Sequence, residues 1–380
     1  MKSIEKVFVL LVALLMVGGM LVAAGSSEES PAGTEAAPAP ASLDSFSMDN
    51  MPELSDFTAV LETQADPSKT GSLVIYSTCS SHENEGVLEM FKAKYPNISM
   101  EIIGGGTGEL TSRIDSEAAN PQGDVMWGGL NQQSYGAWAD LFTKYLPVGY
   151  ENLYDFFQTD QNIIWMHVDS PAVLVNNALI EELGVEINTY DDLLNEKLKG
   201  WIIAADPTTS SSSRMWFTTA LLYHGGIEND EAWNYLEALM ENFDGFIASS
   251  SSHPFTFTTA GEYAVGLTYM AASIRMLMDG ADVSYVLFDP TMIQGFGMGM
   301  IKNAPNEENA KLFMDFILSD EWQSYYSVIG MGGTTTTATN FNRHLEAINN
   351  VSALEINWSE LDSQTEIFKE MWRDTWESYK

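Results

Sequence analysis

The sequence is poor in cysteine and in basic residues. Cys79 is the only cysteine among 380 residues, which excludes an internal disulfide and any metal site built from several cysteines. The 17 lysine and arginine residues are outnumbered by 53 aspartate and glutamate residues, so the net charge is −36. Because nucleic acid and anionic membranes repel such a chain, we expect neither as a partner.

Signatures of common enzyme classes are also missing. The chain has no Gly-x-Ser-x-Gly elbow, P-loop, His-Glu-x-x-His motif or EF-hand loop, and its five histidines lack metal-ligand spacing. His82 lies three residues from Cys79, but nothing identifies an oxyanion hole, so a capping or cleft-lining histidine is the better interpretation. We therefore predict a protein that is not an enzyme and has neither cofactor nor metal.

The longest apolar run is at the N-terminus. Lys2 and Lys6 precede residues 7–24, which end in small side chains, and this pattern predicts a signal peptide over residues 1–24. An uncleaved anchor is the alternative, because this run is borderline for a membrane span. No cysteine lies at the cleavage site, so we expect a periplasmic protein without a lipid anchor. Residues 25–70, rich in Ser, Ala, Pro, Glu and Thr, predict a disordered linker.

From Gly71 onward, apolar strands alternate with amphipathic helices, which predicts an α/β fold. We expect strands 163–166 and 172–175 to pair around Pro171 and to mark a crossing between two lobes. The predicted first lobe spans residues 71–165 and about 290–330, and the second spans 166–289 and about 331–380. Other expected elements are strands at 201–205 and 245–248 and one long helix over 306–323.

The stretch from Asp206 to Arg214 is the strongest candidate for a binding element. An apolar strand precedes it and a helix follows, so a hydroxyl-rich turn leads into a helix N-terminus. The first N–H groups of a helix have no partner within it, and the helix dipole favours an anion there. The competing interpretation is a turn in which one hydroxyl caps the helix.

Four other turns at predicted strand ends are rich in small or hydroxyl residues: 77–82, 104–108, 127–129 and 249–252. Ligands of open α/β sheets gather at the carboxyl ends of strands. Small side chains and free N–H donors hold a polar small molecule rather than transfer protons. The turns fall in both halves of the chain, as a cleft between two lobes requires.

Several segments resemble extracellular solute-binding proteins of ABC importers. They are the strand Leu73–Ser77, the Lys-Tyr-Pro-Asn turn at 94–97, the loop 105–110, and segments 120–129, 205–207 and 261–269. The resemblance covers residues 71–335 and is closest to the type II cluster that binds ferric ion and hexose phosphates. It implies an α/β periplasmic binding protein type II fold, with two hinged lobes around a cleft. It also implies a monomer that delivers its solute to an inner-membrane permease.

The same resemblance indicates a solute class. The ferric branch uses a histidine, a glutamate and two adjacent tyrosines, of which only His82 is matched here. Gly129 or its neighbour takes the glutamate position, and residues 270–272 take the tyrosine region, with only Tyr269 nearby. The anion-binding turns of the cluster correspond to 208–212 and 251–252, which are retained. We therefore expect a small anionic solute, such as a sugar phosphate or a phosphonate.

The predicted ligand-binding residues form three groups. Those expected to hold the anion are Thr209, Ser210, Ser211, Ser212, Ser251 and Ser252; those expected from the first lobe are Ser77, Thr78, His82, Gly106, Thr107 and Gly129; and those expected to pack the organic part are Trp127 and Tyr269. Asp206, Arg214 and Arg275 are secondary candidates. Alternative functions are binding of a ferric-iron complex, binding of an organic cation such as a polyamine or thiamine, and hydrolysis of phosphate esters with His253 as the base.

Overall fold

The computed structural model describes residues 52–329, 333–336, 340–345 and 351–380. The predicted signal peptide, residues 1–24, and the part of the predicted linker from 25 to 51 lie outside the described residues. Across the ranges that are described, none of the helices combines the length and the apolar character needed to span a membrane.

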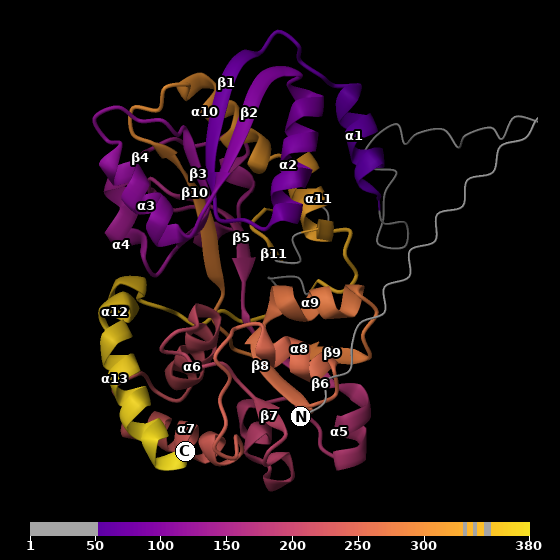
Figure 1. Cartoon of the computed structure of the whole chain (residues 1–380), viewed down its shortest axis with the longest axis vertical. Helices are drawn as coiled ribbons and strands as arrows, with labels where there is room; N and C mark the ends of the chain where they lie inside the picture. The colour runs from indigo at the N-terminus through magenta and orange to yellow at the C-terminus, as the bar shows by residue number, and fades with distance from the viewer. Residues whose placement is uncertain (1–51, 330–332, 337–339, 346–350) are drawn as a thin grey trace, which may run out of the picture. The chain divides into compact units, whose positions relative to one another are not determined.

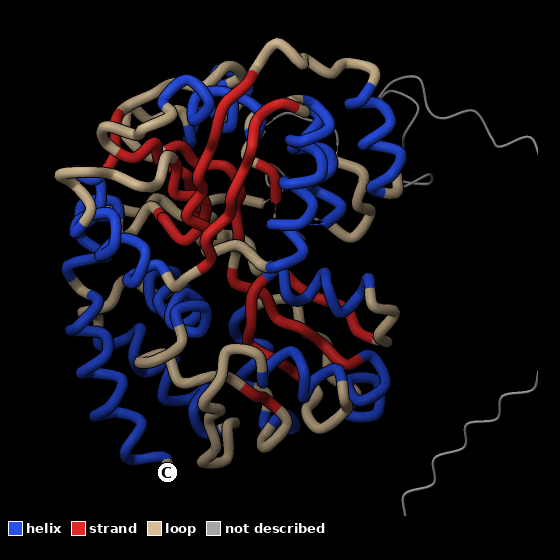
Figure 2. The backbone as a smooth tube through the Cα atoms, turned by 45° about the horizontal axis from the view of Figure 1, so that its top comes forward, coloured by secondary structure: helices blue, strands red, loops and turns tan. Residues whose placement is uncertain are grey.

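The described residues form two sheets, of which the first has seven strands (Figure 1 and Figure 2). Its order is β11-β5-β10-β3-β1-β2, and β4 pairs with β10. The strands are β1 (Thr70–Ser77), β2 (Asn97–Gly104), β3 (Val125–Asn131), β4 (Phe142–Thr143), β5 (Ile164–Asp169), β10 (Gln294–Ile301) and β11 (Gly333–Thr334). β1 is parallel to β2 and β3, whereas β10 is antiparallel to β3 and β5. The sheet is therefore mixed.

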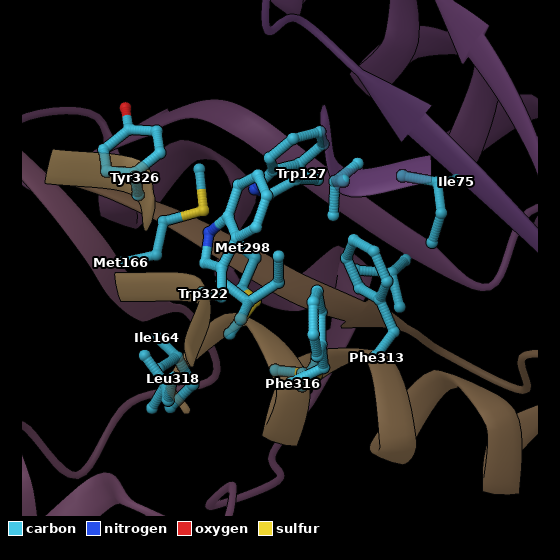
Figure 3. Packing of buried hydrophobic residues seen from close by; sticks show 14 of the residues in the cluster. Ile75, Trp127, Ile164, Met166, Met298, Phe313, Phe316, Leu318, Trp322 and Tyr326 are labelled. Atoms are coloured by element: carbon cyan, nitrogen blue, oxygen red, sulfur yellow. The ribbon is translucent and has the colours of Figure 1, made fainter. Parts of the chain in front are cut away.

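Helices cover this sheet, and an aromatic-rich core lies between the sheet and the helices. They are α1 (Leu54–Glu62), α2 (Ser81–Lys94), α3 (Thr107–Ser116), α4 (Tyr135–Trp138), α10 (Glu307–Ile317) and α11 (Asp320–Ile329). Figure 3 shows Trp127 of β3 surrounded by side chains from α10 and α11. The Trp127 ring lies 5.9 Å from both Phe313 and Trp322, with edge-to-face geometry. Such pairs contribute beyond their buried area.

The second sheet has the order β7-β8-β6-β9 and a core of its own. Its strands are β6 (Pro171–Asn176), β7 (Ile202–Ile203), β8 (Val265–Tyr269) and β9 (Val283–Val286). Its helices are α5 (Asn177–Leu183), α6 (Ser211–Tyr223), α7 (Asp230–Glu241), α8 (His253–Thr259), α9 (Met270–Met278), α12 (Trp358–Ser363) and α13 (Thr365–Trp376). The C-terminal helix belongs to this core, because Trp372 lies 4.4 Å from Phe217 between ring centroids.

The chain crosses from the first sheet to the second at Ser170. The strands expected to pair around Pro171 do not pair with each other, since β5 joins the first sheet and β6 the second. The Asp169 backbone ends β5 opposite Gln294 of β10, and Pro171 begins β6 opposite Tyr269 of β8. Two adjacent apolar runs give no signal that distinguishes a hairpin from a passage between sheets.

The region predicted as linker contains a helix. In α1, Phe57, Val60 and Leu61 share one buried face, with the spacing of an amphipathic helix. The Phe57 ring packs 5.1 Å from that of Tyr325 on α11. Only three residues of α1 are buried, and the segment around the helix is polar in composition. The amphipathic pattern is therefore too short to be recognised in the sequence.

The helix predicted over 306–323 is two helices. α10 ends at Ile317, and α11 begins at Asp320. Ser319 Oγ accepts a hydrogen bond from the Trp322 N–H at 3.3 Å, as an N-terminal cap does. The expected strands at 201–205 and 245–248 are also shorter, since β7 has two residues and Ala248 forms one bridge, to Ala205.

Helix α8 packs closely on β8, and Gly266 makes this contact possible. A Cβ at Gly266 would lie 2.5 Å from the Pro254 carbonyl oxygen and 2.6 Å from Thr258 Oγ1. Overpacking of this kind typically costs about 1–3 kcal/mol. We therefore expect Gly266→Ala to lower the free energy of unfolding by about that amount, measured by urea denaturation.

Gly108→Ala is the matched control. A Cβ at Gly108 in α3 would meet nothing within 4 Å, and alanine has the higher helix propensity. Its stability should equal or exceed that of the wild type. Equal stability of both variants and the wild type would contradict the close packing of α8 on β8.

Candidate functional site

A pocket of about 340 Å³ collects residues from both sheets, and we call it the serine pocket. Most of its lining is polar. The residues are Asn131, Gln133, Ser134, Asp169, Ser211, Ser212, Arg214, Met215, Ser251, Tyr269, Gln294, Phe296, Asp362 and Thr365. A concave pocket with convergent polar groups is the usual form of a small-molecule site.

The first turn of α6 supplies one side of the serine pocket. The helix begins at Ser211, earlier than the sequence suggested, so Ser211 and Ser212 lie in its first turn. Ser210 Oγ accepts a hydrogen bond from the Ser213 N–H at 3.2 Å and lies 3.2 Å from Ser212 Oγ. The cap thus satisfies one of the first N–H groups, and the helix dipole makes the others attractive to an anion.

Asp206 stabilises this turn through hydrogen bonds. Its Oδ1 accepts hydrogen bonds from the Thr208 N–H at 2.8 Å and the Thr208 hydroxyl at 2.7 Å. The Asp206 carbonyl accepts from the Ser210 N–H at 2.8 Å. Asp206 therefore builds the turn and does not line the serine pocket, and Thr209 is exposed outside it.

Arg214 is the one basic residue among the described residues that line the serine pocket. Its guanidinium donates one hydrogen bond to the Pro207 carbonyl at 2.9 Å. Burial lowers the pKa of Arg214, although an arginine remains charged at any physiological pH. A half-buried cation at a helix N-terminus is unfavourable for the helix dipole, so a bound anion would compensate for its position.

The second serine turn contributes one residue. Ser251 lines the serine pocket, whereas Ser250 and Ser252 bond to each other through their hydroxyl groups at 2.9 Å. Ser252 thus supports the turn that presents Ser251. Arg275, the other secondary candidate, is exposed on α9 and does not line the pocket.

Asp169 and Tyr269 lie together in the pocket, at the crossing between the sheets. Asp169 Oδ1 accepts hydrogen bonds from the Ser170 N–H at 2.9 Å and the Ala271 N–H at 3.3 Å. Burial raises the pKa of Asp169 to about 7. Burial, and then the nearby Asp169 carboxylate, raises the pKa of Tyr269 to about 12. Asp169 is therefore a carboxylate that changes its charge near neutral pH.

The residues predicted from the first lobe lie outside the serine pocket. Thr78, Thr107 and Gly129 are brought together, since a Cβ at Gly129 would lie within 2.8 Å of both threonine hydroxyls. Ser77 is buried and donates a hydrogen bond to Asn84 Oδ1 at 2.7 Å. The other two, His82 and Gly106, are exposed at the beginnings of α2 and α3.

Trp127 was predicted to pack against the ligand, and this prediction is wrong. Its side chain is fully buried, and its indole Nε1 has no hydrogen-bond partner among the described residues. The physical reason is the alternation of side chains along a strand, because the face of β3 that carries Trp127 points into the core under α10 and α11 (Figure 3).

Several pocket residues were not predicted from the sequence. Asp169 follows an apolar run and precedes Ser-Pro, and this pattern could have indicated a polar residue where the chain passes between the sheets. Gln294 lies opposite Asp169 in the next strand, so only the register reveals it. Asp362 and Thr365 come from the C-terminal helices and have no local signal. The described residues contain no cluster of three or more side chains suited to hold a metal ion.

Comparison with known proteins places this fold in one class. A model of the bacterial extracellular solute-binding protein family matches residues 81–324, so the chain belongs to that family. The predicted type II periplasmic binding fold is also confirmed by its structural neighbours.

Three similar proteins illustrate the family. The periplasmic binding protein AfuA of Actinobacillus pleuropneumoniae, solved with exogenous fructose 6-phosphate bound, is 25% identical; the match covers 81% of this chain and 99% of that one, with a TM-score of 0.66. Iron uptake protein A1 of Synechocystis is 24% identical over 68% of this chain and 74% of its own length. An uncharacterized protein of Haemophilus influenzae is 26% identical over 70% and 78%.

The raised pKa of Asp169 predicts a stability effect with a defined sign. Its ordinary pKa is 3.8 and its folded value about 7, so the folded state binds the proton more tightly. Stability is then lost as the pH rises from about 4 to about 7. Asp169→Asn removes this loss, and we expect it to stabilise the protein by about 1–2 kcal/mol at about pH 8, because each tenfold change in acidity corresponds to about 1.4 kcal/mol and solvent screens part of it.

Thermal unfolding of both proteins at about pH 4 and about pH 8 measures this effect. The stabilisation should be small at the lower pH, where Asp169 is protonated in the folded chain and still partly protonated in the unfolded chain. Asp282→Asn, at an exposed carboxylate outside the serine pocket, serves as the control. A gain for Asp169→Asn that is equal at both pH values would contradict the titration of Asp169.

Proposed function

We propose that this chain is the periplasmic solute-binding component of an ABC importer whose solute is a small phosphorylated organic molecule. The observation that carries the proposal is the combination of Ser211, Ser212 and Arg214 at the N-terminus of α6, facing one pocket. Backbone N–H groups, hydroxyl groups and a guanidinium are the donors that bind phosphate and phosphonate oxygens.

The rest of the serine pocket suits a hydroxylated organic group. Asn131, Gln133 and Gln294 offer amide donors and acceptors, and Asp169 offers a carboxylate acceptor. Sugar hydroxyls require such paired donors and acceptors. The similarity to AfuA, which was solved with fructose 6-phosphate, supports the same solute class.

We further propose that the two sheets mark two lobes and that the solute binds between them. The serine pocket draws Asn131 from the first sheet and Tyr269 from the second. Closure of the lobes on a solute would then present one defined conformation to a permease.

An organic cation is the second candidate, because two carboxylates line the serine pocket. Asp169 and Asp362 can pair with an ammonium group, and Tyr269 can pack against it. A ferric-iron complex has less support, since His82 is exposed on α2 and does not line the serine pocket. Hydrolysis has no support from His253, which stacks on Phe257 at 4.8 Å and does not line the pocket.

Calorimetric titration with glucose 6-phosphate, inorganic phosphate, a phosphonate, spermidine and ferric citrate tests the proposal. We expect glucose 6-phosphate to bind to the wild type. Arg214→Gln should weaken that binding by about 10–100-fold, because a charge-assisted hydrogen bond is worth about 1.5–3 kcal/mol. Arg275→Gln, which removes an exposed arginine outside the pocket, is the control and should bind as the wild type does.

Two results would contradict the anion proposal. One is binding of spermidine or ferric citrate without binding of any phosphate ester or phosphonate. The other is unchanged affinity of Arg214→Gln for glucose 6-phosphate when its thermal unfolding matches that of the wild type.

The affinity for an anionic solute should also depend on pH through Asp169. Ionisation of this carboxyl at about pH 7 places a negative charge in the pocket beside Tyr269. The other charged residues that line the pocket are Asp362 and Arg214. The dissociation constant for glucose 6-phosphate should therefore rise by about tenfold between about pH 6 and about pH 8, relative to Asp169→Asn. The ratio of the two proteins removes the titration of the phosphate itself. A ratio that stays constant over this range would refute the coupling.

A further inference from the structure

A second pocket of about 350 Å³ adjoins the serine pocket, and we call it the aromatic pocket. The two pockets share Gln133 and Asp362, which line both. A solute held at the N-terminus of α6 can therefore extend past these two side chains. The aromatic pocket draws on α4 and on α12, which lie next to each other in Figure 1.

Four aromatic side chains line the aromatic pocket: Tyr135, Phe156, Trp165 and Trp358. Trp165 is fixed, because it is buried and its Nε1 donates a hydrogen bond to Thr159 Oγ1 at 3.2 Å. The Phe156 ring stacks parallel to that of Tyr154 at 5.9 Å between centroids, yet 46% of Phe156 is exposed. An exposed ring that its neighbours hold in place is ready to pack against a ligand.

The polar groups of the aromatic pocket are amides, hydroxyls and one carboxylate. They include Gln161, Ser359 and Asp362, and the described lining contains no lysine, arginine or histidine. A second phosphate would thus have no cation to pair with. A neutral group with several hydroxyls would find donors in the amides and acceptors in Asp362.

We infer that the aromatic pocket receives a neutral sugar ring of the same solute whose anionic group binds at the N-terminus of α6. The inference rests on the proposed function, and it makes the solute a phosphorylated oligosaccharide rather than a single sugar phosphate. The C–H faces of a sugar ring are apolar and pack on aromatic rings, while its hydroxyls bond to the surrounding amides and carboxylate. A planar heterocycle would use the rings but leave most of these polar groups without partners.

The C-terminal part of the chain builds one wall of this pocket. Trp358 and Asp362 belong to α12, which lies beyond the family match over residues 81–324. Leu361 anchors α12 in the second core, and Gln133 Nε2 donates a hydrogen bond to Thr365 Oγ1 of α13 at 2.9 Å. That bond joins the wall to the loop after β3, so the aromatic pocket is held on both sides.

Calorimetric titration with glucose 6-phosphate and trehalose 6-phosphate tests this inference, because the second compound adds one neutral ring to the first. We expect trehalose 6-phosphate to bind about tenfold more tightly to the wild type. Phe156→Ala should remove most of this preference and leave the glucose 6-phosphate affinity within about twofold. Gln161→Ala should reduce the same preference through the loss of its amide.

Phe246→Ala is the matched control, since Phe246 is also 46% exposed and lines neither pocket. It should keep the preference for trehalose 6-phosphate. Thermal unfolding of each variant verifies that the fold is intact.

The outcomes separate the two proposals. Binding of glucose 6-phosphate with equal or weaker binding of trehalose 6-phosphate would overturn the sugar-ring inference alone, as would full retention of the preference in Phe156→Ala. Tighter binding of adenosine 5′-monophosphate than of trehalose 6-phosphate would assign the aromatic pocket to a heterocycle and also overturn it. Failure of every phosphate ester to bind would overturn the proposed function and this inference with it.

Discussion

One buried hydroxyl joins the two segments that connect the sheets. Ser170 is fully buried at the point where the chain leaves the first sheet, and its Oγ donates a hydrogen bond to the Met292 carbonyl at 2.9 Å, where the chain returns. A buried hydroxyl without a partner would be costly, so the outgoing and returning segments must stay together. This places Asp169 opposite Gln294 and positions Tyr269 beside them. The floor of the serine pocket is thus a consequence of the crossing itself.

An anion site in a chain of net charge −36 is consistent with how charge acts in water. Salt screens the field of carboxylates that lie more than about 10 Å away. The N–H groups of α6 and the Arg214 guanidinium, in contrast, would contact a bound anion directly. The sign of the whole chain therefore governs its behaviour toward large charged surfaces. The local donors govern its small ligand.

The sequence allowed the α/β fold and the hydroxyl-rich turn before α6 to be predicted, because both have local signals. Alternating strands and helices appear as periodic apolar positions, and the first turn of α6 is legible as a run of serines after a buried strand. The rest of the pocket depends on contacts between distant segments. Trp127 was expected in the cleft because it lies at the end of a predicted strand. The alternation of side chains along β3 instead directs it into the core. Asp362 lies on a polar helix surface, where no pattern distinguishes a pocket-lining carboxylate from a solvated one.

The short helix α12 has a consequence for how such a protein can diversify. Leu361 is its one buried residue among those described, so most of its positions are free to change without loss of stability. The turn that would hold the anion lies far away in the sequence and is constrained by its own hydrogen bonds. Mutation could therefore revise the wall that would face the variable part of the proposed solute, while the turn proposed for its charged group stays constant. A duplicated copy of the gene could acquire a new solute through the few codons that encode α12.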